Sequence, residues 1–463
     1  MRRGLAIGLA LVLTVALFGC AARQEAVQTV PPAADAAAGS EAGPTSAQAP
    51  EKEAWDYEVV METAAEEEKA DDGTVLAAWQ FERPVLRMKS TSGKTFDGHL
   101  PNLGVTAEQI AICKAFNDEV AAYEMASLEE FDSFRKEGSE QYAWKTQQGI
   151  DFLTLTDQLT VESVFHSGDL LSIRAAEYVN MGGAHPDWSY VVWNFDLGEG
   201  AFVTPMSLTG RPEALRRVIA DEIVNQIYAS EAYEGYFQDF EETVRAKTDF
   251  DAFFDENGMT VLFTEYEIAP HALGVPEFTI GRDRLVSYLN ERGERLLAPS
   301  SEDRAVGDFY EANDMWYWFE GGMPFDNTDT KEFSDMTYYR VDVPGVTSIA
   351  DLRAQMQTRF SDDVVQQRLV NSMGGMYPLL REVDGVAYVI PAGRGTDMYI
   401  DSVSCRAELD ADGKSGRIIA TIQWRDYDEE KEEWVLKDTS DTAMPFVLGE
   451  DGHARFTDFR TIW

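Results

Sequence analysis

The stretch FFDENGMTVLFTEYEIAPHALGVPEFTI, residues 253–280, decides the fold of the central part of the chain. It holds Asn257-Gly258 between two apolar runs, and this dipeptide in such a setting is the strongest short signal for a β-hairpin. The run at 275–280 predicts a further strand, and residues 283–297 predict a short helix. Between the strands lies YEIAPHALG, residues 266–274, in the kind of position where a scaffold often presents binding residues.

The sequence upstream predicts both helices and strands. Pro212 suits the first turn of a helix, and the apolar residues that follow it share one face: Leu215, Val218, Ile219, Ile223 and Ile227. Residues 106–134 also have helical spacing, and residues 79–88 predict a strand with a proline at its edge. Three further short strands are expected at 151–156, 159–166 and 170–180, with a turn at Ser167-Gly168-Asp169 before the last.

Downstream, the polar residues 298–305 are expected to be a linker. Ser348 and Asp351 form a capping box before a helix at 352–360, and Ser361 is expected to cap a second helix. After Asp384 the pattern predicts strands at 386–392, 398–409, 416–427, 433–438 and 444–450, with Asp-Gly turns at 384–385, 412–413 and 451–452. The sequence therefore predicts an α+β fold of two modules, residues 54–297 and 306–463, each a mixed antiparallel sheet with packed helices.

The N-terminal residues predict export. Two arginines precede an almost wholly apolar run, and Gly19 stands directly before Cys20. This anatomy is typical of a bacterial signal peptide, expected at residues 1–19. The segment resembles the lipobox of bacterial lipoproteins, and the resemblance implies a lipid on the Cys20 sulfur. The apolar run is shorter than the roughly 18 residues that a membrane-spanning helix needs. Residues 20–53 lack large apolar side chains and are expected to form a tether.

Two motifs are candidates for binding. The first is YVNMGGAHP, with Gly182, Gly183, Ala184, His185 and Pro186 at its end. Two glycines permit backbone geometry that other residues avoid. The second lies in the loop at 266–274, with Tyr266, Pro270, His271 and Gly274 as its candidate contacts.

A metal or catalytic role for these motifs is the weaker alternative. A metal site needs two or three convergent ligands, and the five histidines show no HxxxH or HExxH spacing. Neither a metal, a cofactor nor catalysis is expected, although His185 and His271 could meet in space. Residues 410–416 hint at a calcium loop, but Lys414 stands at its fifth position and favours a hairpin turn.

Residues 75–297 resemble the extracellular domain of RsiV-type anti-sigma factors, which also precedes the enzymatic module of the peptidoglycan deacetylase PdaC. The strand ending in GGAHP, the helix after Pro212 and the stretch 253–280 carry this resemblance. In RsiV the domain binds lysozyme, so the resemblance implies an envelope module that binds or senses a protein. The chain shows neither the transmembrane helix and cytoplasmic segment of RsiV nor the deacetylase module of PdaC.

Residues 306–400 are similar to the IseA family, inhibitors of cell-wall DL-endopeptidases. The matching runs are TSIADL, FSDD, LREVDGVAYV and PAGRG, in that order. In that family an acidic loop enters the basic cleft of the hydrolase, so this resemblance implies inhibition.

The net charge of −43 argues against a nucleic-acid partner and favours basic ones. We therefore expect a surface lipoprotein that binds lysozyme or an endogenous cell-wall hydrolase, as a sensor or an inhibitor. One alternative is a glycan-binding module that stacks sugars on Trp316 and Trp318, although core packing is the favoured interpretation of these rings. Another is a wall-remodelling enzyme with His185 as acid or base.

Overall fold

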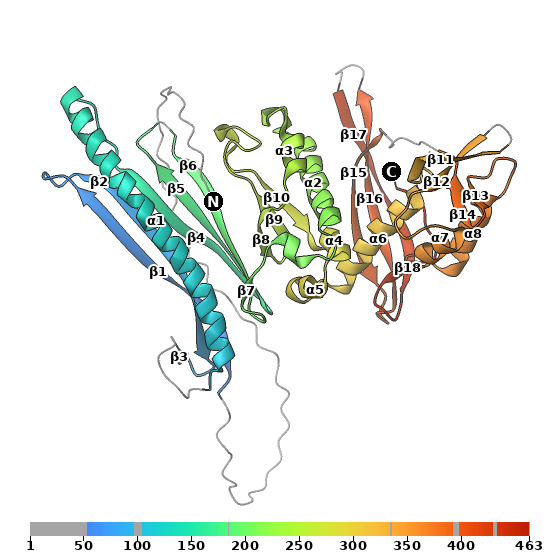
Figure 1. Cartoon of the computed structure of the whole chain (residues 1–463), viewed down its shortest axis with the longest axis horizontal. Coiled ribbons are helices and arrows are strands. Elements are labelled where there is room, and N and C mark those ends of the chain that lie inside the picture. The colour runs from blue at the N-terminus through green and yellow to red at the C-terminus, as the bar shows by residue number, and fades with distance from the viewer. Residues whose placement is uncertain are drawn as a thin grey trace, which may run out of the picture. The chain divides into compact units, whose positions relative to one another are not determined.

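The computed structural model describes residues 53–96, 104–183, 185–333, 336–391, 398–428 and 433–462 (Figure 1). The expected signal peptide, Cys20, nearly all of the expected tether, Ala184 and residues 393–395 lie outside them. The chain forms two compact units. Of the described residues, unit 1 comprises those up to 162 together with those of 175–191 and 199–201, and unit 2 comprises those of 163–174, 192–198 and 202–462.

A mixed sheet with the strand order β1-β2-β4-β5-β6-β7 begins the fold, and β3 pairs with β2. Strand β1 is antiparallel to β2, whereas β4 is parallel to β2. The residues of β4, β5 and β6 are divided between the two units. The strands are β1 (Trp55–Lys69), β2 (Val75–Ser90), β3 (Thr95–Phe96), β4 (Leu155–Ser167), β5 (Leu170–Asn180), β6 (Asp187–Asp196) and β7 (Ala201–Phe202).

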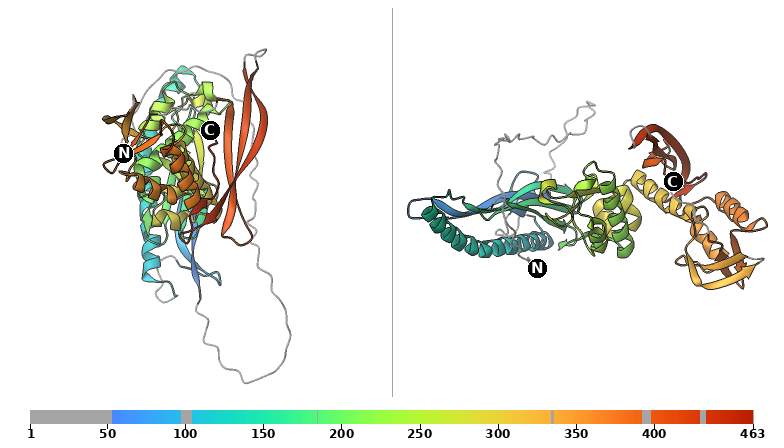
Figure 2. Two further views of the ribbon diagram at one scale, coloured as in Figure 1. Left: turned by 90° about the vertical axis from the view of Figure 1, so that its right-hand side faces the viewer. Right: turned by 90° about the horizontal axis from the view of Figure 1, so that it is seen from above.

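Helix α1 (Ala107–Gln148) begins at the expected Thr106, which forms a capping box with Gln109. It runs well past the expected end at 134. The reason is its packing on β2: a Cβ at Gly138 would lie 2.7 Å from the carbonyl oxygen of Leu76, so the helix is held close to the strand there. Figure 2 shows α1 along one face of β1 and β2. The strands expected at 151–156 and 159–166 are likewise one strand, β4.

Unit 2 contains the sheet β10-β9-β8, built from β8 (Asp251–Asp255), β9 (Gly258–Leu262) and β10 (Glu277–Gly281). The Asn257-Gly258 hairpin is confirmed. Helices α2 (Pro212–Tyr228) and α3 (Phe240–Ala246) accompany the sheet, and the expected stripe of α2 is buried apart from Val218, which is half-buried. This stripe joins a core made of residues between Leu170 and Leu297.

The segment after β10 differs from the expectation. The single helix expected at 283–297 is divided into α4 (Arg282–Leu285), a short 3-10 turn η4 (Val286–Tyr288) and α5 (Glu291–Leu297), which Asn290 caps. Part of the expected linker is helical, because Ser300 caps α6 (Ser301–Tyr317) through a capping box with Asp303. The domain boundaries drawn from the sequence stay a prediction.

The remainder of unit 2 contains two four-stranded sheets, with orders β11-β12-β14-β13 and β15-β16-β17-β18. Their core holds residues between Ala305 and Ile462. The elements are β11 (Phe325–Phe333), β12 (Met336–Val341), α7 (Ile349–Gln357), α8 (Asp362–Met373), β13 (Leu380–Val383), β14 (Val386–Val389), β15 (Ile400–Leu409), β16 (Ser415–Asp428), β17 (Glu433–Leu448) and β18 (Ala454–Phe456).

Local signals in this part are mostly confirmed. Ser348 and Asp351 form the capping box of α7, and Ser361 occupies the N-cap position of α8 without a side-chain bond. Residues 410–416 form the β15–β16 hairpin, with Gly413 at φ 63°. The strands expected at 433–438 and 444–450 are one strand, β17, because the polar residues between them pair along β16.

Trp316 is part of the core, which excludes its use as an exposed stacking platform for sugars. The side chain is 9% exposed. Its indole donates a hydrogen bond to Glu320 at 3.0 Å, and the guanidinium of Arg368 lies 4.4 Å from its ring. Trp318 packs against the same core as a partly buried residue. Within the described ranges, no helix is both long and apolar enough to cross a membrane.

Candidate functional site

The first candidate motif is a turn between β5 and β6, and Gly182 fixes its shape. Gly182 has φ 76°, and its N–H donates to Asn180 Oδ1 at 2.8 Å. A Cβ at this position would lie 2.7 Å from Oε1 of Gln141, on α1. Gly183 and His185 are exposed, and Pro186 is half-buried. The left-handed backbone at Gly182 therefore favours glycine, while Gly183 meets no such restriction.

The second candidate motif, residues 266–274, is a loop whose middle is buried in the core of unit 2. Ile268 and Ala269 are completely buried. The carbonyl of Ile268 accepts a hydrogen bond from the N–H of Phe237 at 3.0 Å. The loop ends in the 3-10 turn η3 (His271–Leu273) and Gly274, which has φ 69°. Anchored in this way, the loop presents its remaining residues from a fixed backbone.

Tyr266 has an unusual backbone conformation within this loop. Its φ is 62°, in the left-handed region that costs a residue with a Cβ roughly 1–2 kcal/mol. The ring is 54% exposed and stacks on the imidazole of His271, with centroids 6.3 Å apart and planes inclined by 18°. A strained backbone that holds a large side chain at the surface is a feature of binding and catalytic sites.

Two acidic residues flank Tyr266 and fix the loop from either side. Glu265, whose side chain is 6% exposed, contacts His271 Nδ1 through Oε1 at 3.0 Å. Glu267 pairs with Lys247 and accepts from the N–H of Thr264 at 3.0 Å. Partial burial acts to raise the pKa of Glu267, but Lys247 and Thr264 outweigh it and lower that pKa. The loop is thus tied to α3 and to its own start.

Tyr228 and Tyr233, which sequence reasoning missed, are two further exposed aromatic residues of unit 2. They are 51% and 41% exposed, and their rings lie 5.1 Å apart. Tyr233 lies in the 3-10 turn η2 (Tyr233–Gly235), which comes close to the loop: a Cβ at Gly235 would lie 3.0 Å from the side chain of Leu273. Tyr228 directly follows Ile227 and therefore lies off the buried face of α2. From this position in the helix, the sequence could have predicted that Tyr228 is exposed. We call Tyr228, Tyr233, Tyr266 and His271 the tyrosine surface.

The surroundings of the tyrosine surface are acidic. Residues 228–274 hold eleven Asp and Glu against two Lys and Arg. Both cations are in ion pairs: Lys247 with Glu267, and Arg245 with Asp221 and Glu241. The hydroxyl of Tyr228 donates to Glu241 at 2.9 Å, and this bond raises the pKa of Tyr228. The area can therefore offer aromatic contacts and hydrogen bonds to a positively charged partner.

The structure does not bring the two candidate motifs together in one unit. Gly182, Gly183, His185 and Pro186 belong to unit 1, whereas residues 266–274 belong to unit 2. Tyr266, Pro270, His271 and Gly274 do lie together on one loop. Among the described residues, no group of three or more His, Cys, Asp or Glu side chains is arranged to hold a metal ion.

Comparison with known proteins identifies one family in the chain. Residues 210–283 match the family model described as "Protein of unknown function (DUF3298)". A crystal structure of a DUF3298 family member from Bacteroides fragilis is similar, with 16% sequence identity and a TM-score of 0.36, over 53% of this chain and 97% of that one. A DUF3298 family protein from Pseudomonas aeruginosa has 14% identity and a TM-score of 0.31, over 52% and 97%.

No curated protein is similar to the chain. The family match extends from the residues before α2 to the start of α4, so it includes the whole tyrosine surface and excludes residues 182–186. The chain thus contains a DUF3298 domain at residues 210–283.

Proposed function

We propose that the protein is a non-enzymatic surface lipoprotein, held to a membrane by a lipid on Cys20, that binds a basic peptidoglycan-acting protein. The partner is lysozyme or a wall hydrolase of the cell itself, and the role is that of a sensor or an inhibitor. The observation that carries the proposal is the tyrosine surface, where Tyr266 is held exposed in a left-handed conformation within acidic surroundings.

The composition of this surface suits a protein partner. Tyrosine is enriched at the energetic centres of interfaces, because it adds a large contact area and a hydroxyl for little loss of conformational entropy. Tyr266 is also restrained by its contact with His271, so little freedom is left to lose on binding. Rigid exposed rings of this kind are suited to act as anchors.

Charge gives the second line of support. Lysozymes of the C type and many wall hydrolases are basic, and the chain carries a net charge of −43. Complementary charge accelerates encounter and selects against acidic partners. Both cations within residues 228–274 are paired with carboxylates, and the eleven acidic residues of that segment outnumber them.

The resemblances seen in the sequence point the same way. The stretch 253–280 is one of those similar to the lysozyme-binding RsiV domain, and it contains Tyr266 and His271. The similarity of residues 306–400 to the IseA family favours inhibition of a wall hydrolase. Residues 182–186 remain a proposed second contact, with Met181 and Trp188 exposed beside them.

The test is a calorimetric titration of the purified full-length protein with a C-type lysozyme, repeated at several-fold higher salt. A basic protein without wall activity, such as cytochrome c, serves as the control for charge alone. We expect saturable one-to-one binding of lysozyme that persists at high salt, because aromatic contacts are not screened. Cytochrome c binding should disappear at high salt.

Two outcomes would separate the alternatives. If lysozyme fails to bind but a DL-endopeptidase of the same cell binds and loses activity, the inhibitor role stands and the lysozyme role does not. If every basic protein binds equally and all binding vanishes with salt, the tyrosine surface has no specific protein partner and the proposal is wrong.

A further inference from the structure

One end of the sheet β15-β16-β17 exposes aromatic side chains on a single face. The β16–β17 register pairs Tyr427 with Trp434, Arg425 with Leu436 and Gln423 with Thr439. Residues 423, 425 and 427 alternate along β16, so their side chains and those of their partners project from the same face. A register shift after Trp424 leaves Lys437 out of this alternation. We call these six residues the hairpin face.

The rings of the hairpin face are exposed and held at defined angles. Trp434 is 40% exposed and Tyr427 46%. Their centroids lie 5.5 Å apart at 68°, and Tyr399 lies 6.0 Å from Trp434 at 71°. The Arg425 guanidinium stands 4.8 Å from the Trp434 ring and donates through Nε to the Met398 carbonyl at 3.0 Å. These contacts restrain the indole before any ligand arrives.

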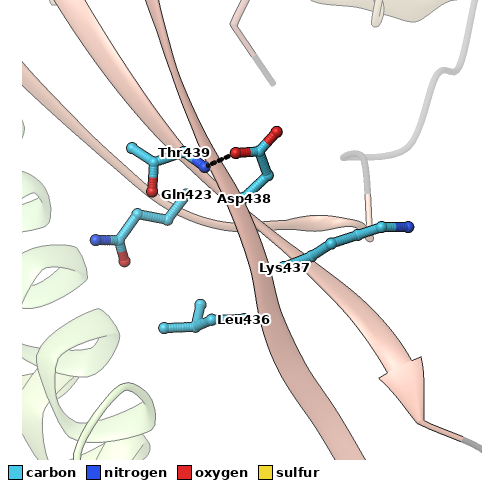
Figure 3. Close-up of a pocket in the computed structure, with 5 residues that line it drawn as sticks. All are labelled: Gln423, Leu436, Lys437, Asp438 and Thr439. Atoms are coloured by element: carbon cyan, nitrogen blue, oxygen red, sulfur yellow. Dashed lines mark hydrogen bonds between the residues drawn. The ribbon is translucent and has the colours of Figure 1, made fainter.

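A hollow of about 380 Å³ lies on the same strands and is lined by Gln423, Leu436, Lys437, Asp438 and Thr439. Figure 3 shows the side chains of Gln423, Leu436 and Thr439 on one side of β17 and that of Lys437 on the other. Thr439 contributes a hydroxyl and Gln423 an amide, which also accepts a hydrogen bond from Ser402 at 2.9 Å. Hydrogen-bonding groups thus lie on the same face as the exposed rings, with the Arg425–Leu436 pair between them.

The charged residues around the hairpin face restrict the class of ligand that it can bind. Arg425 faces Asp401 at 3.8 Å, and Lys437 pairs with Asp426 at 2.6 Å. Both of these cations are therefore paired with carboxylates, and Asp438 adds a further carboxylate at the hollow. Nothing in this balance favours an anionic ligand such as a phosphate-rich polymer or nucleic acid.

A pyranose ring suits the exposed aromatic rings and the uncharged hydrogen-bonding groups of the hairpin face. One of its faces carries C–H bonds, which are attracted to the negative face of an aromatic ring, and its edge carries hydroxyls for amide and hydroxyl partners. We propose that the hairpin face binds an uncharged oligosaccharide, with Trp434 and Tyr427 as stacking residues and Gln423 and Thr439 as hydroxyl partners. The site differs from the tyrosine surface, and the proposal does not rest on the proposed function.

The test uses the purified full-length protein and two uncharged probes, chitohexaose and cellohexaose, in calorimetric titrations. Wild-type protein is compared with Trp434→Ala, and Trp144→Ala is the matched control because it removes an exposed indole from α1. We expect saturable binding of at least one sugar, weakened at least about tenfold by Trp434→Ala and unchanged by Trp144→Ala.

Two further variants distinguish a loss of sugar binding from a loss of the folded structure. Trp434→Phe keeps a ring and should retain measurable binding, while Thr439→Val should weaken binding without loss of the thermal midpoint. The proposal is overturned if wild-type protein binds neither sugar, or if Trp434→Ala binds as wild type does. Loss of lysozyme binding in Trp434→Ala, together with no sugar binding in wild type, would assign the face to a protein contact and would equally overturn it.

Discussion

The ring of Tyr266 stacks on the imidazole of His271, with 6.3 Å between the centroids. The buried carboxylate of Glu265 contacts the same imidazole, with 3.0 Å between Oε1 of Glu265 and Nδ1 of His271. Glu265 and Tyr266, which are neighbours in the sequence, thus both contact His271. Glu265 is buried and holds the imidazole in place, whereas Tyr266 is exposed and stacks on it. Tyr266 adopts a left-handed backbone conformation in this arrangement, with φ 62°.

Substitution of Tyr266 should separate backbone strain from binding. Tyr266→Gly removes the penalty of the left-handed conformation but adds chain entropy to the unfolded state, so stability should change by less than about 1 kcal/mol. Tyr266→Val keeps the left-handed cost that tyrosine already carries and adds the crowding of a β-branched side chain at φ 62°, so it should be less stable than Tyr266→Gly by about 1–2 kcal/mol. Urea unfolding of both variants checks this. Equal loss in both would show that the contact with His271, rather than the backbone, sets the stability.

The two glycines of the first motif should respond differently to the same change. Gly182→Ala places a Cβ 2.7 Å from Gln141 at a positive φ, and should destabilise the protein by about 1–3 kcal/mol. At Gly183 a Cβ meets nothing within 4 Å, so Gly183→Ala should change stability by less than about 0.5 kcal/mol. Thermal unfolding of the pair measures the difference. Similar midpoints would mean that the turn adapts to a side chain at Gly182.

Asp196 should be the more sensitive of two carboxylates that share one arginine. Its side chain is fully buried and contacts Arg292 and Arg295 at 2.7 Å each. Asp169 contacts Arg295 at 2.6 Å but is 44% exposed. Removing a buried charge leaves its partners uncompensated, so Asp196→Asn should cost about 2–4 kcal/mol. Asp169→Asn should cost less than about 1 kcal/mol. Equal costs in denaturant unfolding would contradict this ranking.

The stability of unit 2 should depend on pH through His453. The hydrogen bond from His453 Nδ1 to Asp308, at 2.9 Å, raises the pKa of His453. A raised pKa in the folded state means that the protonated form is stabilised by folding. This contribution is fully present below the ordinary pKa of 6.5 and is lost as the pH rises through the raised value.

His453→Gln cannot titrate and provides the comparison. The thermal midpoint of wild-type protein should exceed that of the variant most at about pH 5, and the difference should shrink towards about pH 9. Asp308 also accepts from the Ala454 N–H at 2.7 Å, so the variant should still fold. A difference that stays constant over this range would show that the proton on His453 does not contribute.

Local signals in the sequence predicted local structure well. The Asn257-Gly258 hairpin, the capping box at Ser348 and the helix after Pro212 depend on neighbouring residues and are present as expected. The length of β17 was underestimated because its polar middle, around Thr439–Thr442, lacks alternating hydrophobicity. That segment is a strand because β16 pairs with it, and pairing is a property of the whole sheet.

The candidate site likewise depends in part on tertiary contacts that the sequence does not reveal. The loop containing Tyr266 and His271 was evident from its apolar flanks and proline, but the left-handed backbone of Tyr266 was not, because nothing in the sequence marks it. Tyr233 lies beside the loop through the contact of Gly235 with Leu273, which joins segments almost forty residues apart. The assignment of Gly182 and Tyr266 to separate compact units is likewise a property of the tertiary structure.

The most direct test of the tyrosine surface compares lysozyme binding by three full-length proteins: wild type, Tyr266→Gly and Tyr377→Ala. Tyr377 is 58% exposed on the segment after α8 and serves as the matched control. We predict that Tyr266→Gly keeps the wild-type thermal midpoint and binds C-type lysozyme at least about tenfold more weakly, while Tyr377→Ala binds as wild type does. Wild-type affinity in Tyr266→Gly would contradict the central claim that this ring anchors the partner.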